Sequence, residues 1–64
     1  MPAKTETEII QIAYEASVSQ VYAIFFESMS TTQSGETQRH AEESFVKGIK
    51  LARRVRDRAL QLIA

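Results

Sequence analysis

The chain has no cysteine and no tryptophan, and its 64 residues include only one proline and two glycines. The absence of cysteine excludes disulfide bridges, thiolate zinc sites and a cysteine nucleophile. The shortage of glycine and proline leaves few positions for a turn and excludes a glycine-rich phosphate loop. The composition therefore favours a few long elements and gives little support to catalysis.

The chain is also short for a folded domain. A domain of this size buries only about 60% of the surface that its unfolded chain exposes, so its core is marginal. Small domains usually compensate with disulfides, a metal or self-association. Because disulfides are excluded, self-association is the supplement that we expect.

Long hydrophobic runs are absent as well. The longest run, Val21 to Phe26, has six residues, whereas a membrane span needs about 20. The residues after Met1 do not resemble an export signal, because the acidic segment Thr5 to Glu8 stands where an apolar run would be needed. We therefore expect a cytoplasmic protein that does not contact a membrane.

The first half of the sequence predicts one long helix, over residues 6–29. The segment Thr5 to Glu8 has the form of a capping box, in which the threonine hydroxyl and the glutamate carboxylate satisfy free backbone amides. No glycine or proline interrupts the chain from there to Met29. Apolar residues recur at three- and four-residue steps along one helix face. They are Ile10, Tyr14, Val18, Val21, Phe25 and Met29.

One break follows at about residues 30–35, where hydroxyl side chains and a glycine gather. A second helix is predicted over residues 36–63. Its apolar seam alternates steps of four and three, which is the spacing of a coiled coil. The seam comprises Ala41, Phe45, Gly48, Ala52, Val55, Ala59 and Leu62. Its small residues predict a close approach of the two helices, which is the simplest reason for a glycine at position 48.

The two parts of the chain carry opposite charge, although the net charge is zero. Residues 1–46 have seven acidic and two basic side chains, and residues 47–64 have one acidic and six basic ones. An antiparallel hairpin that turns near Gln33 places these parts side by side. The predicted cross-hairpin pairs are Glu8 with Arg58, Glu15 with Lys50 and Arg54, and Glu27 with Arg39. We therefore predict an all-α fold, one antiparallel two-helix hairpin.

The first helix is apolar on nearly all sides, since Ile9, Ile12, Ile24 and Phe26 lie off its main face. Such a helix is normally buried on more than one side, which a single hairpin cannot achieve. Two-fold dimers are the commonest oligomers, so we expect two hairpins to form a four-helix bundle. Several dimer topologies fit this pattern. The predicted interface residues are Tyr14, Val18, Val21, Tyr22, Phe25, Met29, Phe45 and Ile49.

A row of cations on the second helix is the main candidate site for a ligand. Lys47, Lys50, Arg54 and Arg58 lie opposite the seam, at about one-turn intervals that can follow phosphates. A solvated charged face is the alternative interpretation, because carboxylates are expected nearby and no aromatic residue accompanies the cations. Arg56 lies at the border of the apolar face, where it can pair with a carboxylate or bind an anion.

Metal binding and catalysis find weaker support. His40 and Glu43 are one turn apart, but both are predicted to face outward near the turn. No serine of the first helix has a base nearby, and a chain of this length cannot easily enclose a substrate. An apolar ligand held among Phe25, Phe26, Met29 and Phe45 is a further hypothesis. Core packing is the simpler interpretation of that cluster, so we expect no cofactor, no metal and no enzyme.

The sequence therefore favours a small, non-catalytic, self-associating helical module. We expect it to act as an adaptor or regulator that binds a protein partner. The competing hypothesis is a nucleic-acid-binding four-helix bundle that uses the basic face of the second helix.

Overall fold

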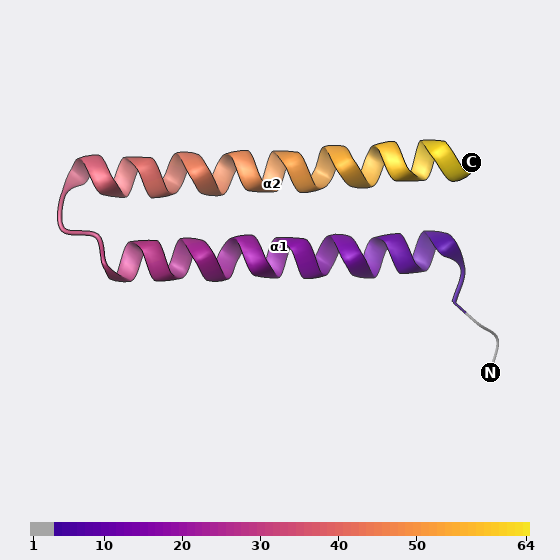
Figure 1. Ribbon diagram of the computed structural model, residues 1–64, viewed down its shortest axis with the longest axis horizontal. Coiled ribbons are helices and arrows are strands. Elements are labelled where there is room, and N and C mark those ends of the chain that lie inside the picture. The colour runs from indigo at the N-terminus through magenta and orange to yellow at the C-terminus, as the bar shows by residue number, and fades with distance from the viewer. Residues whose placement is uncertain (1–3) are drawn as a thin grey trace.

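The computed structural model describes residues 4–64 and contains two helices, α1 (Glu6–Ser30) and α2 (Gly35–Ile63). They lie side by side in opposite directions and form a flat, elongated hairpin (Figure 1). The Cα atoms extend over 50 × 25 × 6 Å. The predicted all-α hairpin is confirmed. α1 ends one residue later, and α2 begins one residue earlier, than the sequence predicted.

The ends of α1 are closed by hydroxyl groups. At its start the Thr5 Oγ1 accepts a hydrogen bond from the Glu8 amide at 3.2 Å. At its end the Ser30 hydroxyl donates to the Phe26 carbonyl at 2.8 Å, and the Thr32 hydroxyl donates to the Ser28 carbonyl at 2.7 Å. The Phe26 and Ser28 carbonyls lie near the end of α1, where hydroxyl side chains commonly add hydrogen bonds to backbone carbonyls.

A reciprocal pair of hydrogen bonds starts α2. The Thr37 amide donates to Ser34 Oγ at 3.2 Å, and the Ser34 amide donates to Thr37 Oγ1 at 3.3 Å. This is a capping box in which threonine takes the place of the usual glutamate. Gly35 is the first helical residue, and no residue of the described chain has a positive φ. The turn is therefore set by hydroxyl capping and not by a left-handed glycine.

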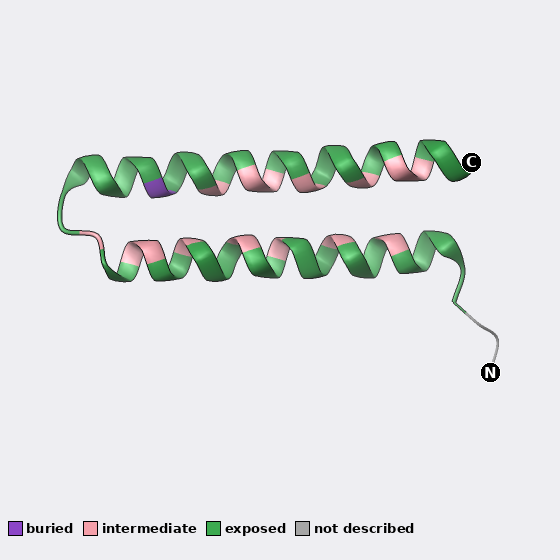
Figure 2. Cartoon of the chain, viewed as in Figure 1, coloured by how far each residue is buried: buried purple, intermediate pink, exposed green. Residues whose placement is uncertain are grey.

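The contact between the helices follows the apolar face predicted for α1. Ile10, Tyr14, Val18, Val21, Phe25 and Met29 are all half-buried, and the partly buried stripes of α1 and α2 face each other in Figure 2. The Phe25 and Phe45 rings have centroids 4.7 Å apart, within the range of a favourable aromatic pair. This face of α1 was predicted correctly.

The contact face of α2 follows the predicted seam as far as Ala52 and includes Ala59 as well. Val55 and Leu62, also predicted in the seam, are instead 58% and 69% exposed, whereas Arg56 and Leu60 are half-buried. A strict heptad keeps to one face only if the helices supercoil, and a straight α-helix drifts about 20° per heptad. The contact on both helices instead repeats at intervals of 11 residues, as in Tyr14 and Phe25, which suits nearly straight helices.

The register of the hairpin also differs from the prediction. Phe25 faces Phe45, Val21 faces Gly48, and Tyr14 faces Arg56, so the pairing is centred near Gly35 and not near Gln33. The linker advances along the helix axis before α2 begins, and the first turn of α2 projects past the end of α1 (Figure 1). This shift of about one helical turn changes every predicted cross-hairpin pair.

The hairpin has almost no interior. Among the described residues only Ala41 is buried, at 7% exposure, and α1 has no buried residue. The reason is geometric, because two helices in contact cover one stripe on each and leave the other sides open. The fold therefore leaves large apolar side chains in contact with solvent.

Candidate functional site

The structure places seven of the eight predicted interface residues between α1 and α2. They are Tyr14, Val18, Val21, Phe25, Met29, Phe45 and Ile49, and each is half-buried by the opposite helix of the same chain. Tyr22 is the exception, because it is 58% exposed. The sequence pattern identified an apolar face correctly, but it could not separate the face that closes the hairpin from a face that meets a partner.

One broad side of the hairpin is hollowed along the line between the helices. Its larger depression, of about 410 Å³, lies between α1 residues from Ile10 to Val21 and α2 residues from Gly48 to Ala59. A second depression, of about 180 Å³, continues from Val21 and Gly48 toward the turn. We call these two connected depressions the groove. Its lining includes Ala13, Ser17, Ile24, Ser44, Leu51, Ala52 and Val55.

Gly48 forms the narrowest part of the groove floor. A Cβ atom built on Gly48 would lie 2.9 Å from Cγ1 and 3.1 Å from Cγ2 of Val21. These distances are shorter than ordinary van der Waals contact, so only glycine allows the present helix spacing. The close approach that the sequence predicted for position 48 is confirmed.

Arg56 lines the larger depression of the groove. Its guanidinium carbon is 4.3 Å from the centroid of the Tyr14 ring, in the geometry of a cation–π contact. Its Nε donates to Asp57 Oδ1 at 3.0 Å, and Nη2 lies 3.0 Å from the same oxygen. Arg56 therefore finds its carboxylate on α2 itself, and its partner on α1 is an aromatic ring.

The cross-hairpin ion pairs predicted from the charge pattern are not formed. Within residues 4–64, Arg56 with Asp57 is the only ion pair within 4.0 Å. The prediction treated residues as neighbours along the axis, but it ignored their angles around each helix and assumed the wrong register. Charge pattern alone therefore did not position these side chains.

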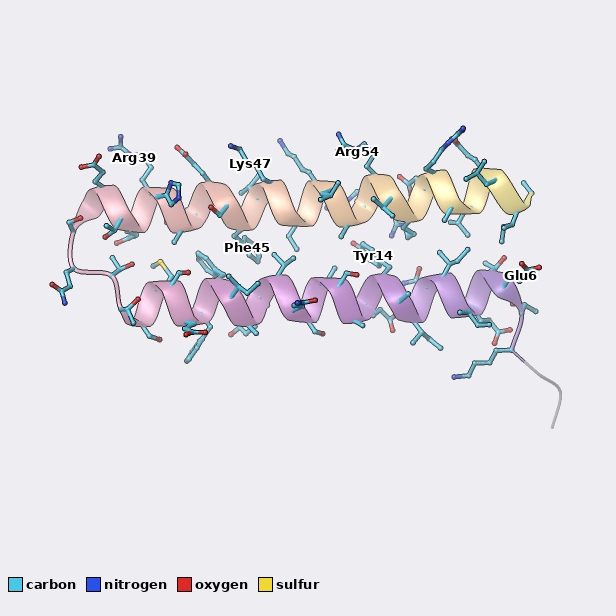
Figure 3. The ribbon with its side chains drawn as sticks, viewed as in Figure 1. Glu6, Tyr14, Arg39, Phe45, Lys47 and Arg54 are labelled. Carbon is cyan, nitrogen blue, oxygen red and sulfur yellow. The ribbon has the colours of Figure 1, made fainter. Side chains whose placement is uncertain are left out.

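The basic face of α2 points away from α1. Figure 3 shows Arg39, Lys47 and Arg54 directed to solvent on the outer side of α2, while Tyr14 and Phe45 lie between the helices. A shallow cleft of about 370 Å³ is lined by Lys50, Arg53, Arg54, Asp57, Arg58 and Gln61. Arg53 was missed in the sequence analysis, although its position next to Arg54 is itself a signal. The one carboxylate that lines the cleft, that of Asp57, already contacts Arg56, so the cleft is predominantly cationic.

The outer side of α1 is apolar. Ile9, Ile12, Tyr22 and Phe26 are exposed large apolar residues, and the centroids of the Tyr22 and Phe26 rings lie 6.4 Å apart. The most apolar 18 residues of α1 have a mean hydropathy of 1.3, so the helix has the length and composition of a membrane span. Counting uninterrupted runs did not detect this, because isolated polar residues break the runs. A helix covered on several sides in a bundle has the same composition.

The pair His40 and Glu43, for which the sequence offered only weak support as metal ligands, has no third candidate ligand placed with it among the described residues. Within residues 4–64, no group of three or more histidine, aspartate or glutamate side chains is placed to hold a metal ion. His40 and Glu43 are both exposed on α2.

Comparisons with protein families, with curated proteins and with solved structures gave no match to this chain. A function for this chain therefore has to be argued from the surfaces described above.

Proposed function

We propose that this chain is a non-catalytic helical module that self-associates into a homodimeric four-helix bundle and binds a protein partner. The observation that carries the proposal is the near absence of an interior, with Ala41 as the single buried residue of the described chain. Burial of apolar surface is the dominant favourable term in folding, so a stable hairpin needs more of it than α1 and α2 provide together. A second copy supplies it.

The surface area of the chain supports this proposal quantitatively. The accessible surface is 5347 Å², whereas a compact monomer of 7.2 kDa has about 4,100 Å². Residues 1–3 contribute at most about 400 Å², the value for an unfolded chain of their mass. The remaining excess of roughly 800 Å² equals the area that one partner buries in a standard interface.

The outer surfaces supply the proposed contacts with a protein partner. Exposed aromatic residues are enriched at protein interfaces, and Tyr22 and Phe26 lie next to each other on the outside of α1. A site of this kind needs no cofactor and fits an adaptor or regulatory role. We expect it to operate in the cytoplasm and without a membrane.

The test is the solution mass of the purified chain, measured by multi-angle light scattering over a range of concentrations without detergent. A mass of two chains supports the proposal. A well-folded monomer at micromolar concentration would overturn it. Recovery of the chain in the membrane fraction, with aggregation when detergent is removed, would instead assign α1 to a bilayer.

A second candidate function, nucleic-acid binding, is favoured by one observation. Lys47, Lys50, Arg54 and Arg58 have no carboxylate within 4.0 Å among the described residues, so their charge is available to phosphates. Binding to phosphates releases counterions, and the logarithm of the affinity then falls linearly with the logarithm of the salt concentration. A steep slope with single-stranded RNA or DNA would establish this function. A chain that purifies free of nucleic acid and does not bind it at low salt would reject this function.

A further inference from the structure

We infer that the groove is the dimer interface and that its occupant is the groove of a second copy, with α1 of each chain lying over α2 of the other. The two-fold axis then runs parallel to the helices, so both linkers lie at the same end of the bundle. This inference rests on the proposed self-association and specifies which surface performs it.

The groove carries little charge. Arg56 is the single charged residue in its lining, and its charge is already matched by Asp57. The outer face of α2, in contrast, carries cations along its length (Figure 3). Two copies of one charged face repel each other, whereas two copies of a neutral apolar face do not. Electrostatics therefore favours the groove over the outer face of α2 for self-association.

The shape of the groove is complementary to itself. Its lining combines small residues, among them Ala13, Gly48 and Ala52, with the exposed larger residues Leu51 and Val55. A two-fold interface uses the same patch on both copies, so that patch must carry both projections and hollows. Leu51 and Val55 of one copy supply the projections, and the small residues of the other supply the hollows. Large residues facing small ones are the usual packing of bundle layers.

The charges of the two helices select the topology. α1 carries four glutamates and no lysine or arginine, and α2 carries seven cations against four carboxylates. Placing α1 over the partner's α2 sets a charge of −4 beside one of +3, and every neighbouring pair of helices is antiparallel. Placing α1 over the partner's α1 sets two helices of −4 beside each other. Neighbouring helices are antiparallel in both arrangements, so the helix dipoles do not distinguish them, whereas the attractive long-range electrostatics favours the first.

The area available also fits one second copy. The excess of roughly 800 Å² per chain gives about 1,600 Å² for a pair, which is the centre of the range for stable interfaces. The groove lies along much of the 50 Å length of the hairpin, from Ile10 to Ser28 on α1. A second hairpin of equal length covers it from end to end.

Two variants on α2 test which face forms the interface. Val55 and Val46 are the same residue type on the same helix, 58% and 47% exposed, but only Val55 lines the groove. We expect Val55→Glu to raise the dimer dissociation constant at least about 100-fold, because it buries a carboxylate at the interface. We expect Val46→Glu to change it by less than threefold. Sedimentation equilibrium measures both, and equal effects of the two variants would overturn the inference.

Distances between spin labels test the topology in the otherwise unchanged dimer. The chain has no cysteine, so Gln33→Cys gives one label per chain at the linker. The proposed arrangement predicts a label separation within about 30 Å, the width of a bundle plus two label arms. A separation near the 50 Å hairpin length would place the linkers at opposite ends and overturn the proposed topology.

The two failures are distinguishable. If the wild-type chain is a folded monomer, the proposed function itself fails. If the wild-type chain is a dimer that Val55→Glu leaves intact, self-association stands and the groove is not its interface.

Discussion

Val21 and Gly48 set the distance between the two helices, because a Cβ on Gly48 would lie 2.9 Å from Val21 Cγ1. Glycine in a helix interior costs about 1 kcal/mol relative to alanine. The chain nevertheless has glycine at position 48, where the opposite helix comes this close. This relationship links a local cost in α2 to the packing of the whole hairpin.

We predict that Gly48→Ala destabilises the protein. The gain in helix propensity of about 1 kcal/mol is outweighed by overpacking, which typically costs 1–3 kcal/mol. Valine in a helix is held in one side-chain rotamer, so Val21 cannot move aside. We expect the free energy of unfolding to fall by about 1 kcal/mol, measured by urea titration with circular dichroism at fixed protein concentration.

Gly35→Ala is the matched control for this prediction. No heavy atom lies within 4 Å of a Cβ built there, so we expect unchanged or slightly higher stability. In the double variant Val21→Ala with Gly48→Ala, the alanine at position 48 should be neutral or stabilising relative to Val21→Ala alone. A Gly48→Ala protein that is more stable in the presence of Val21 would contradict the proposed role of this contact.

The contact between Arg56 and the Tyr14 ring gives a second prediction. A cation–π contact contributes about 0.5–1 kcal/mol at exposed sites and more where it is desolvated. We expect Tyr14→Phe to be nearly neutral, because the ring is retained. A double-mutant cycle of Tyr14→Leu and Arg56→Gln should give a coupling free energy of about 1 kcal/mol. A coupling of zero would show that Arg56 is held by Asp57 alone.

The hairpin and most of its contact surface were predictable from local rules. Apolar spacing located the face of α1 that includes Val21, and the hydroxyl-rich segment located the turn. These rules succeed because capping and periodicity depend on residues close in sequence. The prediction of the contact face was wrong in the C-terminal half of α2, where Arg56 and not Val55 lies against α1. That outcome depends on whether the helices supercoil, which a heptad pattern in one helix does not decide.

The groove could not have been found from the sequence. Its lining alternates between helices, so Ala13 and Leu51 become neighbours only once the register of the hairpin is known. The register depends on how far a short linker advances along the helix axis. No pairing rule based on charge predicted this, because exposed ion pairs contribute too little to select a register. An interface for the proposed dimer therefore had to be sought in the structure.

The capping box at the start of α2 gives a third prediction. Ser34 and Thr37 exchange hydrogen bonds of 3.2 and 3.3 Å, which satisfy amides that would otherwise lack a partner. We expect Ser34→Ala to lower the free energy of unfolding by about 1 kcal/mol, and Ser34→Asp to have little effect. Ser19→Ala, at an exposed position in the middle of α1, is the control and should be neutral. Thermal unfolding, followed by the circular dichroism signal of the helices, measures the stability of all three variants.

The last prediction concerns the unpaired cations of α2. Arg54 stands four residues from both Lys50 and Arg58, and like charges at this spacing destabilise a helix by about 0.2–0.5 kcal/mol per pair. We therefore expect Arg54→Gln to raise the free energy of unfolding by about 0.5 kcal/mol at low salt. The gain should shrink as salt is added, since the repulsion is between exposed charges.

Arg39→Gln is the control on the same outer face. Arg39 has Glu36 three residues before it and Glu43 four residues after it, so its removal should lower stability slightly. Opposite signs for the two variants would show that the row around Arg54 opposes folding and needs another reason to be present, such as a bound polyanion or an acidic partner. Equal signs would show that the charge of α2 acts only through the net field, and the basic face would then carry no evidence of a ligand.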